Sequence, residues 1–237
     1  MRRRVRLLGT LLAVVGALFI VWALVVWQWQ DPFTALYTTW KQHQLAGQYA
    51  KRAAAFRATV SADGTLSTER RDIAAEAARY RLETHAGEAI GRIVVPRIGV
   101  NMVVVDGTDH DSLTKGPGRD LETFMPGENQ LIYIAGHRTT YLAPFAHIDL
   151  MRKRDEITLK VPYGTFVYRV TGQRIVRADD LSVLRPRTHE LLILQACHPR
   201  FFATHRFLVY AQLVHVEPRA GTPFDLSAAG AIQSSRR

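Results

Sequence analysis

The hydrophobic positions of the chain follow two different patterns. Residues 7–27 read LLGTLLAVVGALFIVWALVVW, a run of 21 residues without a charge. A run of this length is sufficient to cross a bilayer as a helix. From residue 91 onwards, short runs rich in β-branched residues alternate with turn residues. The sequence therefore predicts an apolar helix followed by a β-rich domain.

The β-rich part contains seven or eight short strands with no long amphipathic helix between them. This spacing indicates an all-β barrel or sandwich. Pro96 and Pro162 fall at the ends of expected strands, where the missing N–H group costs little. The expected strand runs are GRIVV, IGVNMVVV, QLIYIAG, EITLKV, GTFVYRVTGQRIV, LLILQA and RFLVYAQLVHV.

The stretch between the apolar helix and the first strand has no sustained apolar period. We expect a flexible joint over residues 59–68, which are rich in Ser, Thr, Asp and Gly, and a short helix over residues 72–84 that ends by Gly87. The predicted organisation is a basic N-terminus (1–6), a transmembrane helix (7–27), a linker or helical stalk (28–88), a catalytic β-barrel (89–217) and a flexible tail (218–237).

The residues that flank the apolar run predict its orientation. Arginines at positions 2, 3, 4 and 6 hold that end in the cytoplasm, whereas Trp22, Trp27 and Trp29 suit the opposite interface. A cleavable signal peptide is the alternative, but the run is longer than such regions and no A-x-A site follows it. We expect a single-pass protein of the cell membrane whose domain lies outside the cytoplasm.

Composition narrows the choice of partners and chemistry. The formal charge of +10 is scattered along the chain apart from two short terminal clusters, so it does not argue for nucleic-acid binding. Anionic lipid or an anionic cell wall would be an equally natural neighbour. The chain has a single cysteine, which excludes an intramolecular disulfide. Cys197 is therefore either an inert residue of the core or a reactive thiol.

Three residues are placed to form a cysteine nucleophile site. Cys197 follows the strand-like run LLIL, so its sulfur is expected at the rim of a sheet. A thiol needs a base or cation beside it, because only the thiolate attacks. His137 ends the run LIYIAG next to a glycine, and Arg206 opens the strand that follows Cys197. An arginine suits a developing oxyanion because it stays charged and donates fixed hydrogen bonds.

Other residues compete for these roles. His198 is adjacent to the thiol in sequence, but neighbours along a strand point to opposite faces. His205 is expected to be a solvated neighbour. Arg200 lies in the loop after Cys197, and we favour Arg206 because of its position in the strand.

Three segments together resemble the sortase family, and its class E members in particular. They are residues 133–141 (YIAGHRTTY) followed by APF at 143–145, residues 194–201 (LQACHPRF) with Arg206 at the expected distance, and residues 91–98 (GRIVVPRI). The similarity covers about residues 89–217. It implies a closed eight-stranded β-barrel with short helices. The family's cysteine segment usually reads T-L-x-T-C, and here Ala196 stands in place of the threonine next to the thiol.

The resemblance implies a transpeptidase mechanism. Cys197 attacks the threonine carbonyl of a Leu-Pro/Ala-x-Thr-Gly type sorting signal, Arg206 binds the oxyanion, and His137 protonates the leaving glycine amine. An amine of a peptidoglycan precursor then opens the thioacyl-enzyme. The expected partners are therefore sorting-signal proteins, this precursor and the membrane. The sequence shows no cluster of metal ligands, and no cofactor is expected.

Three alternatives stay open at this point. A pilin polymerase would take its amine from a lysine of another protein. A cysteine protease would release the thioacyl intermediate to water. A non-catalytic, membrane-tethered β-barrel would bind wall polymer or a partner protein through its basic surface, with Cys197 buried and inert.

Overall fold

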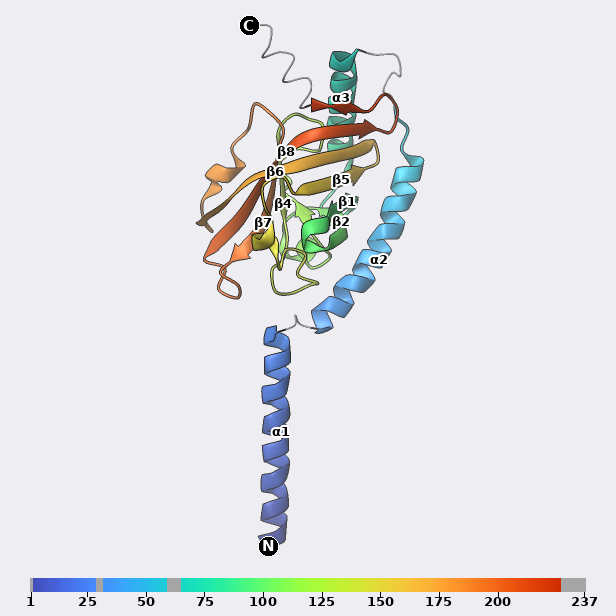
Figure 1. Ribbon diagram of the computed structural model, residues 1–237. Coiled ribbons are helices and arrows are strands. Elements are labelled where there is room, and N and C mark those ends of the chain that lie inside the picture. Colours follow the sequence, from blue (N-terminus) through green and yellow to red (C-terminus); the bar gives the residue numbers. More distant parts are fainter. Residues whose placement is uncertain (1, 29–31, 59–64, 227–237) are drawn as a thin grey trace.

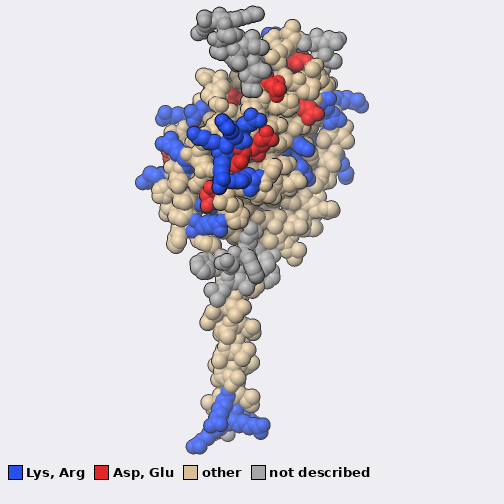
Figure 2. Space-filling view, in the orientation of Figure 1, with Lys and Arg blue, Asp and Glu red and all other residues tan. Residues whose placement is uncertain are grey.

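The computed structural model describes residues 2–28, 32–58 and 65–226, and Figure 1 shows a β-rich body from which helix α1 (Arg2–Gln28) projects. The stretch Arg2–Ala23 is long and apolar enough to cross a membrane, and none of it is buried in the protein. Basic side chains cluster at its free end (Figure 2). This stretch overlaps the predicted range of 7–27, and α1 itself continues to Gln28. Trp29 and the side chain of Trp27 lie outside the described part.

Helix α2 (Pro32–Ala55) packs against the body, although residues 28–88 were expected to form a linker or stalk. Thr38 is fully buried and donates to the carbonyl of Thr114 (2.9 Å). The Gln42 amide donates to the carbonyls of Val103 (3.0 Å) and Lys115 (2.8 Å), and its oxygen accepts from the Val103 N–H (2.7 Å). Gln42 therefore satisfies backbone groups of the body. Leu45, which is 4% exposed, adds an apolar contact with Val103 and Val105, so both polar and apolar contacts hold α2.

Helix α3 (Leu66–Glu83) starts six residues earlier than the predicted range of 72–84 and contributes to the barrel core. Ile73, Ala77 and Tyr80 lie on one face of the helix and are 3%, 0% and 2% exposed. Gly87 adopts a left-handed φ of 81° in the turn beyond the helix end. The predicted joint falls partly on residues 59–64, which lie outside the described residues, and its remainder belongs to α3 and the residue before it.

The β-strands close into the predicted eight-stranded barrel, and all seven expected runs form strands. The order is β6-β5-β1-β2-β3-β4-β7-β8-β9, and β6 also pairs with β8, which closes the circle. The strands are β1 (Ala89–Val95), β2 (Val100–Asp106), β3 (Gly118–Arg119), β4 (Leu131–Ala135), β5 (Glu156–Val161), β6 (Gly164–Arg177), β7 (Leu191–His198), β8 (His205–Pro218) and β9 (Phe224–Asp225).

The C-terminal segment, where we expected a flexible tail from residue 218, contains a short strand. Phe224 of β9 pairs with Val216 of β8. Residues 227–237 lie outside the described part of the chain.

Strand β7 is buried on both faces, which explains its continuous apolar run. Leu192, Leu194 and Ala196 point into the barrel and are each 0% exposed. Leu191 and Ile193 point outward into a second apolar cluster with Val183 of the β6–β7 connection and Leu208 of β8. Because side chains alternate along a strand, Cys197 lies on the outward face with Ile193.

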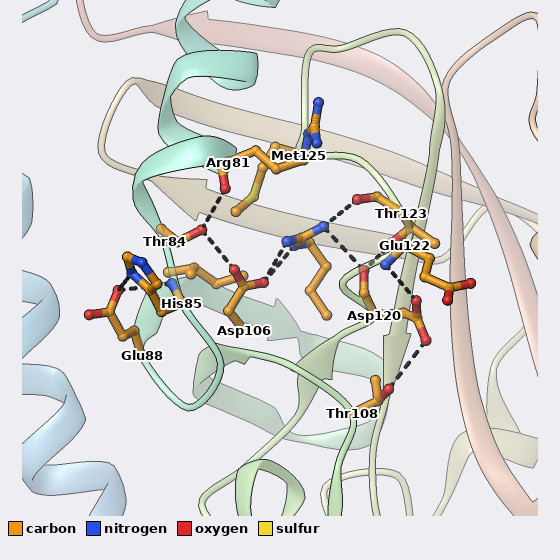
Figure 3. Close-up of polar contacts among 12 residues, drawn as sticks. Arg81, Thr84, His85, Glu88, Asp106, Thr108, Asp120, Glu122, Thr123 and Met125 are labelled. Atoms are coloured by element: carbon orange, nitrogen blue, oxygen red, sulfur yellow. Dashed lines mark hydrogen bonds and ion pairs between the residues drawn. The ribbon is translucent and has the colours of Figure 1, made fainter.

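A buried ion pair joins β2 to β3. Asp106 and Arg119 are 0% and 2% exposed at the side chain, and their closest N–O distance is 2.7 Å. The Thr84 hydroxyl donates to the second carboxylate oxygen of Asp106 (2.7 Å), as Figure 3 shows. The pair therefore fixes the α3–β1 connection against the barrel wall.

We expect Asp106→Ala to destabilise the protein by about 3–5 kcal/mol, because it leaves the Arg119 charge buried without its partner. Chemical denaturation measures this change. Asp179→Ala is the control, since it breaks an exposed ion pair with Arg177 and should change the stability little. Equal effects of the two substitutions would contradict this interpretation of the buried pair.

Candidate active site

Cys197 and Arg206 face each other across two neighbouring strands. Strands β7 and β8 are antiparallel, and their register places Cys197 directly opposite Arg206. Residues opposite one another in such a pair have Cβ atoms about 4.5–5.5 Å apart and point to the same face. Both side chains are half-buried. The strand continues one residue beyond the cysteine, whereas we expected it to end there.

His137 reaches the same rim from the other side of β7. Strands β4 and β7 are parallel, and Ala135 pairs with Gln195. The N–H group of Gly136 donates to the carbonyl of Gln195 (3.0 Å), which continues the pairing past the end of β4. His137 follows Ala135 by two residues, as Cys197 follows Gln195. The register thus brings the imidazole, thiol and guanidinium to one rim on three adjacent segments.

The buried Tyr133 on β4 lies close to two of these groups. Burial raises the pKa of Tyr133, the Arg206 charge opposes the rise, and Cys197 adds a smaller electrostatic effect. Both groups therefore lie near the outward face of the sheet that carries Tyr133. The Arg206 guanidinium itself donates to the carbonyls of Ala203 (2.8 Å) and His205 (3.1 Å), at the edge of the β7–β8 loop.

The environment of His137 favours the neutral imidazole. Burial lowers the pKa of His137, and the nearby His110 lowers it further. Among the described residues, its buried Nε2 atom has no hydrogen-bond partner. The ring packs against Tyr141 at 5.0 Å between centroids, and Tyr141 in turn contacts the His110 ring at 6.3 Å. A neutral ring with a free nitrogen is able to accept a proton from a neighbouring thiol.

The segment after His137 is held in an unusual backbone conformation. Tyr141, Leu142 and Ala143 have successive φ values of 52°, 60° and 37°. Left-handed residues of this kind cost roughly 1–2 kcal/mol each. The Tyr141 N–H donates to the Thr34 hydroxyl of α2 (3.1 Å). Helix α2 therefore supports the turn that presses Tyr141 against the histidine.

Arg138 supports the cysteine from the opposite face of the sheet, a role that the sequence did not reveal. It is 6% exposed, donates to the Cys197 carbonyl (3.3 Å), and contacts Nδ1 of His198 (3.0 Å). Its other terminal nitrogen pairs with Asp149 (3.0 Å), and the guanidinium lies 5.8 Å from the Phe207 ring. Arg138 thus fixes the backbone that carries the thiol.

The competing residues point elsewhere. Arg200 is exposed and donates to the carbonyl of Ala146. His198 lies on the inner side with Phe207, at 6.0 Å between ring centroids, as the alternation along the strand predicts. His205 is exposed and contacts the Thr204 hydroxyl. This geometry favours Arg206 and His137 as the partners of Cys197.

Ala196 lies on the side away from the site. Its side chain is fully buried in the barrel core. A threonine hydroxyl at this position would therefore point inward, so its loss affects packing below the thiol more directly than any substrate contact. Within the described residues, no group of three His, Cys, Asp or Glu side chains is arranged to hold a metal ion.

We expect His110→Ala to raise the pKa of His137, because it removes a neighbour that disfavours the imidazolium. The pKa should stay below the ordinary histidine value, since burial is the larger cause. NMR titration of the His137 ring in the full chain measures the shift. His43→Ala, an exposed histidine of α2, is the control. An unchanged or lower pKa in His110→Ala would contradict the described geometry.

Comparison with known proteins decides the family. The Sortase domain matches residues 93–214, and Sortase D of Bacillus subtilis is 33% identical over 201 residues, which cover 83% of this chain and 96% of the relative. The chain belongs to the sortase family. Sortase SrtE1 of Streptomyces coelicolor is 23% identical over 150 residues, 56% of this chain and 43% of that protein.

Solved sortase structures share the barrel. A Clostridium perfringens Sortase D5 transpeptidase superimposes with a TM-score of 0.58 at 23% identity, covering 73% of this chain and 98% of its own. The SrtA sortase from Actinomyces oris gives 0.52 at 30% identity, covering 57% and 84%. The predicted family and fold are confirmed. Because the relatives carry several class names, assignment to class E stays a prediction.

Proposed function

We propose that this sortase is a membrane-anchored cysteine transpeptidase with Cys197 as nucleophile, His137 as acid and base, and Arg206 as the oxyanion-binding group. The observation that carries the proposal is the register of β4, β7 and β8, which aligns the three residues at one rim. Imidazole, thiol and guanidinium together satisfy the requirements of acyl transfer through a thioester.

The first half-reaction forms the thioacyl-enzyme. Neutral His137 takes the thiol proton, and the Cys197 thiolate attacks the threonine carbonyl of a Leu-Pro/Ala-x-Thr-Gly type signal. The carbonyl oxygen becomes an oxyanion. Arg206 releases the carbonyls of Ala203 and His205 and donates its hydrogen bonds to this oxyanion. The C–N bond to glycine breaks as the His137 imidazolium gives its proton to the leaving amine.

The second half-reaction transfers the acyl group. An amine of a cell-wall precursor attacks the thioester carbonyl, and His137 takes the proton that this amine loses. The C–S bond breaks, Cys197 is regenerated, and a new amide joins the protein to the precursor. A Clostridium perfringens sortase C has been solved with a C-terminal cell wall sorting motif, which supports this substrate class for the family.

The proposed location follows from α1. Its unburied apolar stretch and its basic N-terminal end favour a single span with the N-terminus in the cytoplasm. The barrel would then lie outside, at the surface where secreted sorting-signal proteins and the wall precursor meet.

Product analysis separates this proposal from its alternatives. The full-length protein is incubated in detergent with Leu-Pro-x-Thr-Gly and Leu-Ala-x-Thr-Gly peptides and a small amine, and the products are identified by mass. Cleavage between Thr and Gly with an amine adduct supports the transpeptidase, while a free carboxylate alone supports a protease. Lysine-bearing pilin peptides used in preference to a wall-type amine would favour a pilin polymerase.

The full chain is the appropriate material for this experiment. A fragment starting near Gly87 would lack α3, whose Tyr80 is 2% exposed and donates to the Ile90 carbonyl (2.9 Å). It would also lack Thr34, which supports the turn after His137. No turnover of any peptide by the full chain would favour the non-catalytic binding module.

A further inference from the structure

Helix α2 carries exposed apolar and aromatic side chains on the face turned away from the barrel. Leu36, Tyr37 and Trp40 are 73%, 41% and 53% exposed. Trp40 lies one helical turn after the adjacent Leu36 and Tyr37, while Thr38 on the opposite side is fully buried. The Lys41 ammonium lies 4.6 Å from the Trp40 ring. This combination of aromatic rings with a cation is typical of the headgroup region of a membrane.

The β7–β8 loop presents a second set of aromatic side chains. Phe201 and Phe202 are 60% and 79% exposed. Phe201 has a φ of 71°, which is rare for a bulky residue, and Ala203 has a φ of 52°. Backbone strain of this kind persists where the surrounding structure imposes it, often for a function. Here it accompanies two rings held in solvent, where they contribute little to the core.

Both sets lie at the end of the body that is nearest to the candidate span. Four peptide steps separate Gln28 of α1 from Pro32 of α2, a reach of at most about 14 Å. In Figure 1 the start of α2 and the β7–β8 loop are at the lower end of the body, towards α1. On the face drawn in Figure 2, the described part of this lower edge shows few charged side chains.

We infer that Leu36, Tyr37, Trp40, Phe201 and Phe202 form an aromatic rim that rests in the headgroup region of the bilayer crossed by α1. This inference rests on the proposed membrane anchorage. Two segments more than 160 residues apart in sequence contribute to the rim, and both adjoin the active site. Thr34 at the start of α2 supports the turn after His137, and the loop follows Cys197 directly.

The aromatic rim fixes the position of the Cys197 thiol relative to the membrane surface. With the loop at the lipid surface, Cys197, which lies just before this loop, is held next to the headgroups. The site then receives substrates that are themselves anchored in the bilayer, whereas a freely tumbling domain on a tether would sample many orientations. The inferred seating therefore favours membrane-bound substrates over soluble peptides.

Spin labels test the contact between the aromatic rim and the bilayer without requiring turnover. In a Cys197→Ala background, a single cysteine replaces Phe202 or Trp40, and the full chain is labelled and reconstituted into vesicles of phosphatidylcholine and phosphatidylglycerol. We expect both labels to be accessible to oxygen and shielded from a water-soluble nickel complex. Leu66→Cys, at the end of α3 remote from α1, is the exposed control and should show the reverse.

Labels at Phe202→Cys and Trp40→Cys that are as accessible to nickel as the control would overturn the inference. The background lacks the proposed nucleophile, so this result is independent of whether the protein is a transpeptidase. If the control label also enters lipid, the inferred orientation is wrong.

Activity supplies a second test with intact Cys197. The double variant Phe201→Ser, Phe202→Ser should cleave a soluble sorting peptide in detergent at the normal rate. With the same peptide fused to a membrane span and reconstituted in vesicles, we expect a loss of about tenfold or more, because the loop no longer partitions into the headgroups. Equal losses on both substrates would make the loop a peptide-binding element and contradict the inference.

Discussion

Replacing Cys197 with alanine should reduce acyl transfer to below detection, at least about a thousandfold, while the barrel stays folded. The thiol sulfur is the atom that forms the covalent intermediate, and no other cysteine exists in the chain. The side chain is half-buried at the rim, and its strand is held by backbone pairing with β4 and β8. Removing one sulfur atom should therefore change the free energy of unfolding little.

Rates with sorting peptides and a denaturation curve for Cys197→Ala measure the two parts of this prediction. His205→Ala is the matched control, because this exposed histidine lies at the same rim and its ring contacts the neighbouring Thr204 hydroxyl. It should keep normal turnover. Residual transfer by Cys197→Ala, with a product that still carries the amine, would exclude Cys197 as the nucleophile.

Substitution of Arg206 by lysine should lower kcat by roughly a hundredfold, with a smaller effect on KM. Lysine keeps the positive charge but cannot reproduce the planar fork that donates several fixed hydrogen bonds. The oxyanion exists only after attack, so the lost bonds act on the transition state more than on substrate binding. Steady-state kinetics with a fluorogenic sorting peptide separate the two constants.

Arg200→Lys is the matched control for this experiment. Arg200 lies in the β7–β8 loop, six residues before Arg206, is exposed, and directs its guanidinium to the Ala146 carbonyl. Its kcat should stay close to that of the unchanged protein. A normal kcat in Arg206→Lys together with a large loss of kcat in Arg200→Lys would contradict this assignment. The oxyanion-binding group would then be Arg200.

The strands were predictable because burial imposes a simple pattern of apolar residues on them. Runs such as LLILQA are apolar throughout, since β7 is covered on both faces. Helix α2 was not predictable in the same way. The side it turns to the barrel carries Thr38 and Gln42, which bind backbone groups through polar side chains, while Leu36 and Trp40 are exposed. Leu45 does pack against the barrel, but the exposed apolar residues at the start of the helix obscure any apolar stripe that would mark the packed face.

The same contrast applies to the candidate site. His137, Cys197 and Arg206 fall at strand ends or beginnings, so strand prediction alone brought them to a rim. Arg138 and His110 act through contacts with residues distant in sequence, and neither contact has a local signal. From the sequence alone, an arginine next to the histidine would be expected on the surface. Arg138 is instead 6% exposed and donates to the Cys197 carbonyl.

The most direct test of the central claim is the intact mass of the full-length protein after brief incubation with a Leu-Pro-x-Thr-Gly or Leu-Ala-x-Thr-Gly peptide. We predict an added mass equal to the peptide fragment that ends in threonine. It should map to Cys197, be absent in Cys197→Ala and disappear when an amine is added. An unmodified protein with both peptides, or an adduct that persists in Cys197→Ala, would contradict the account.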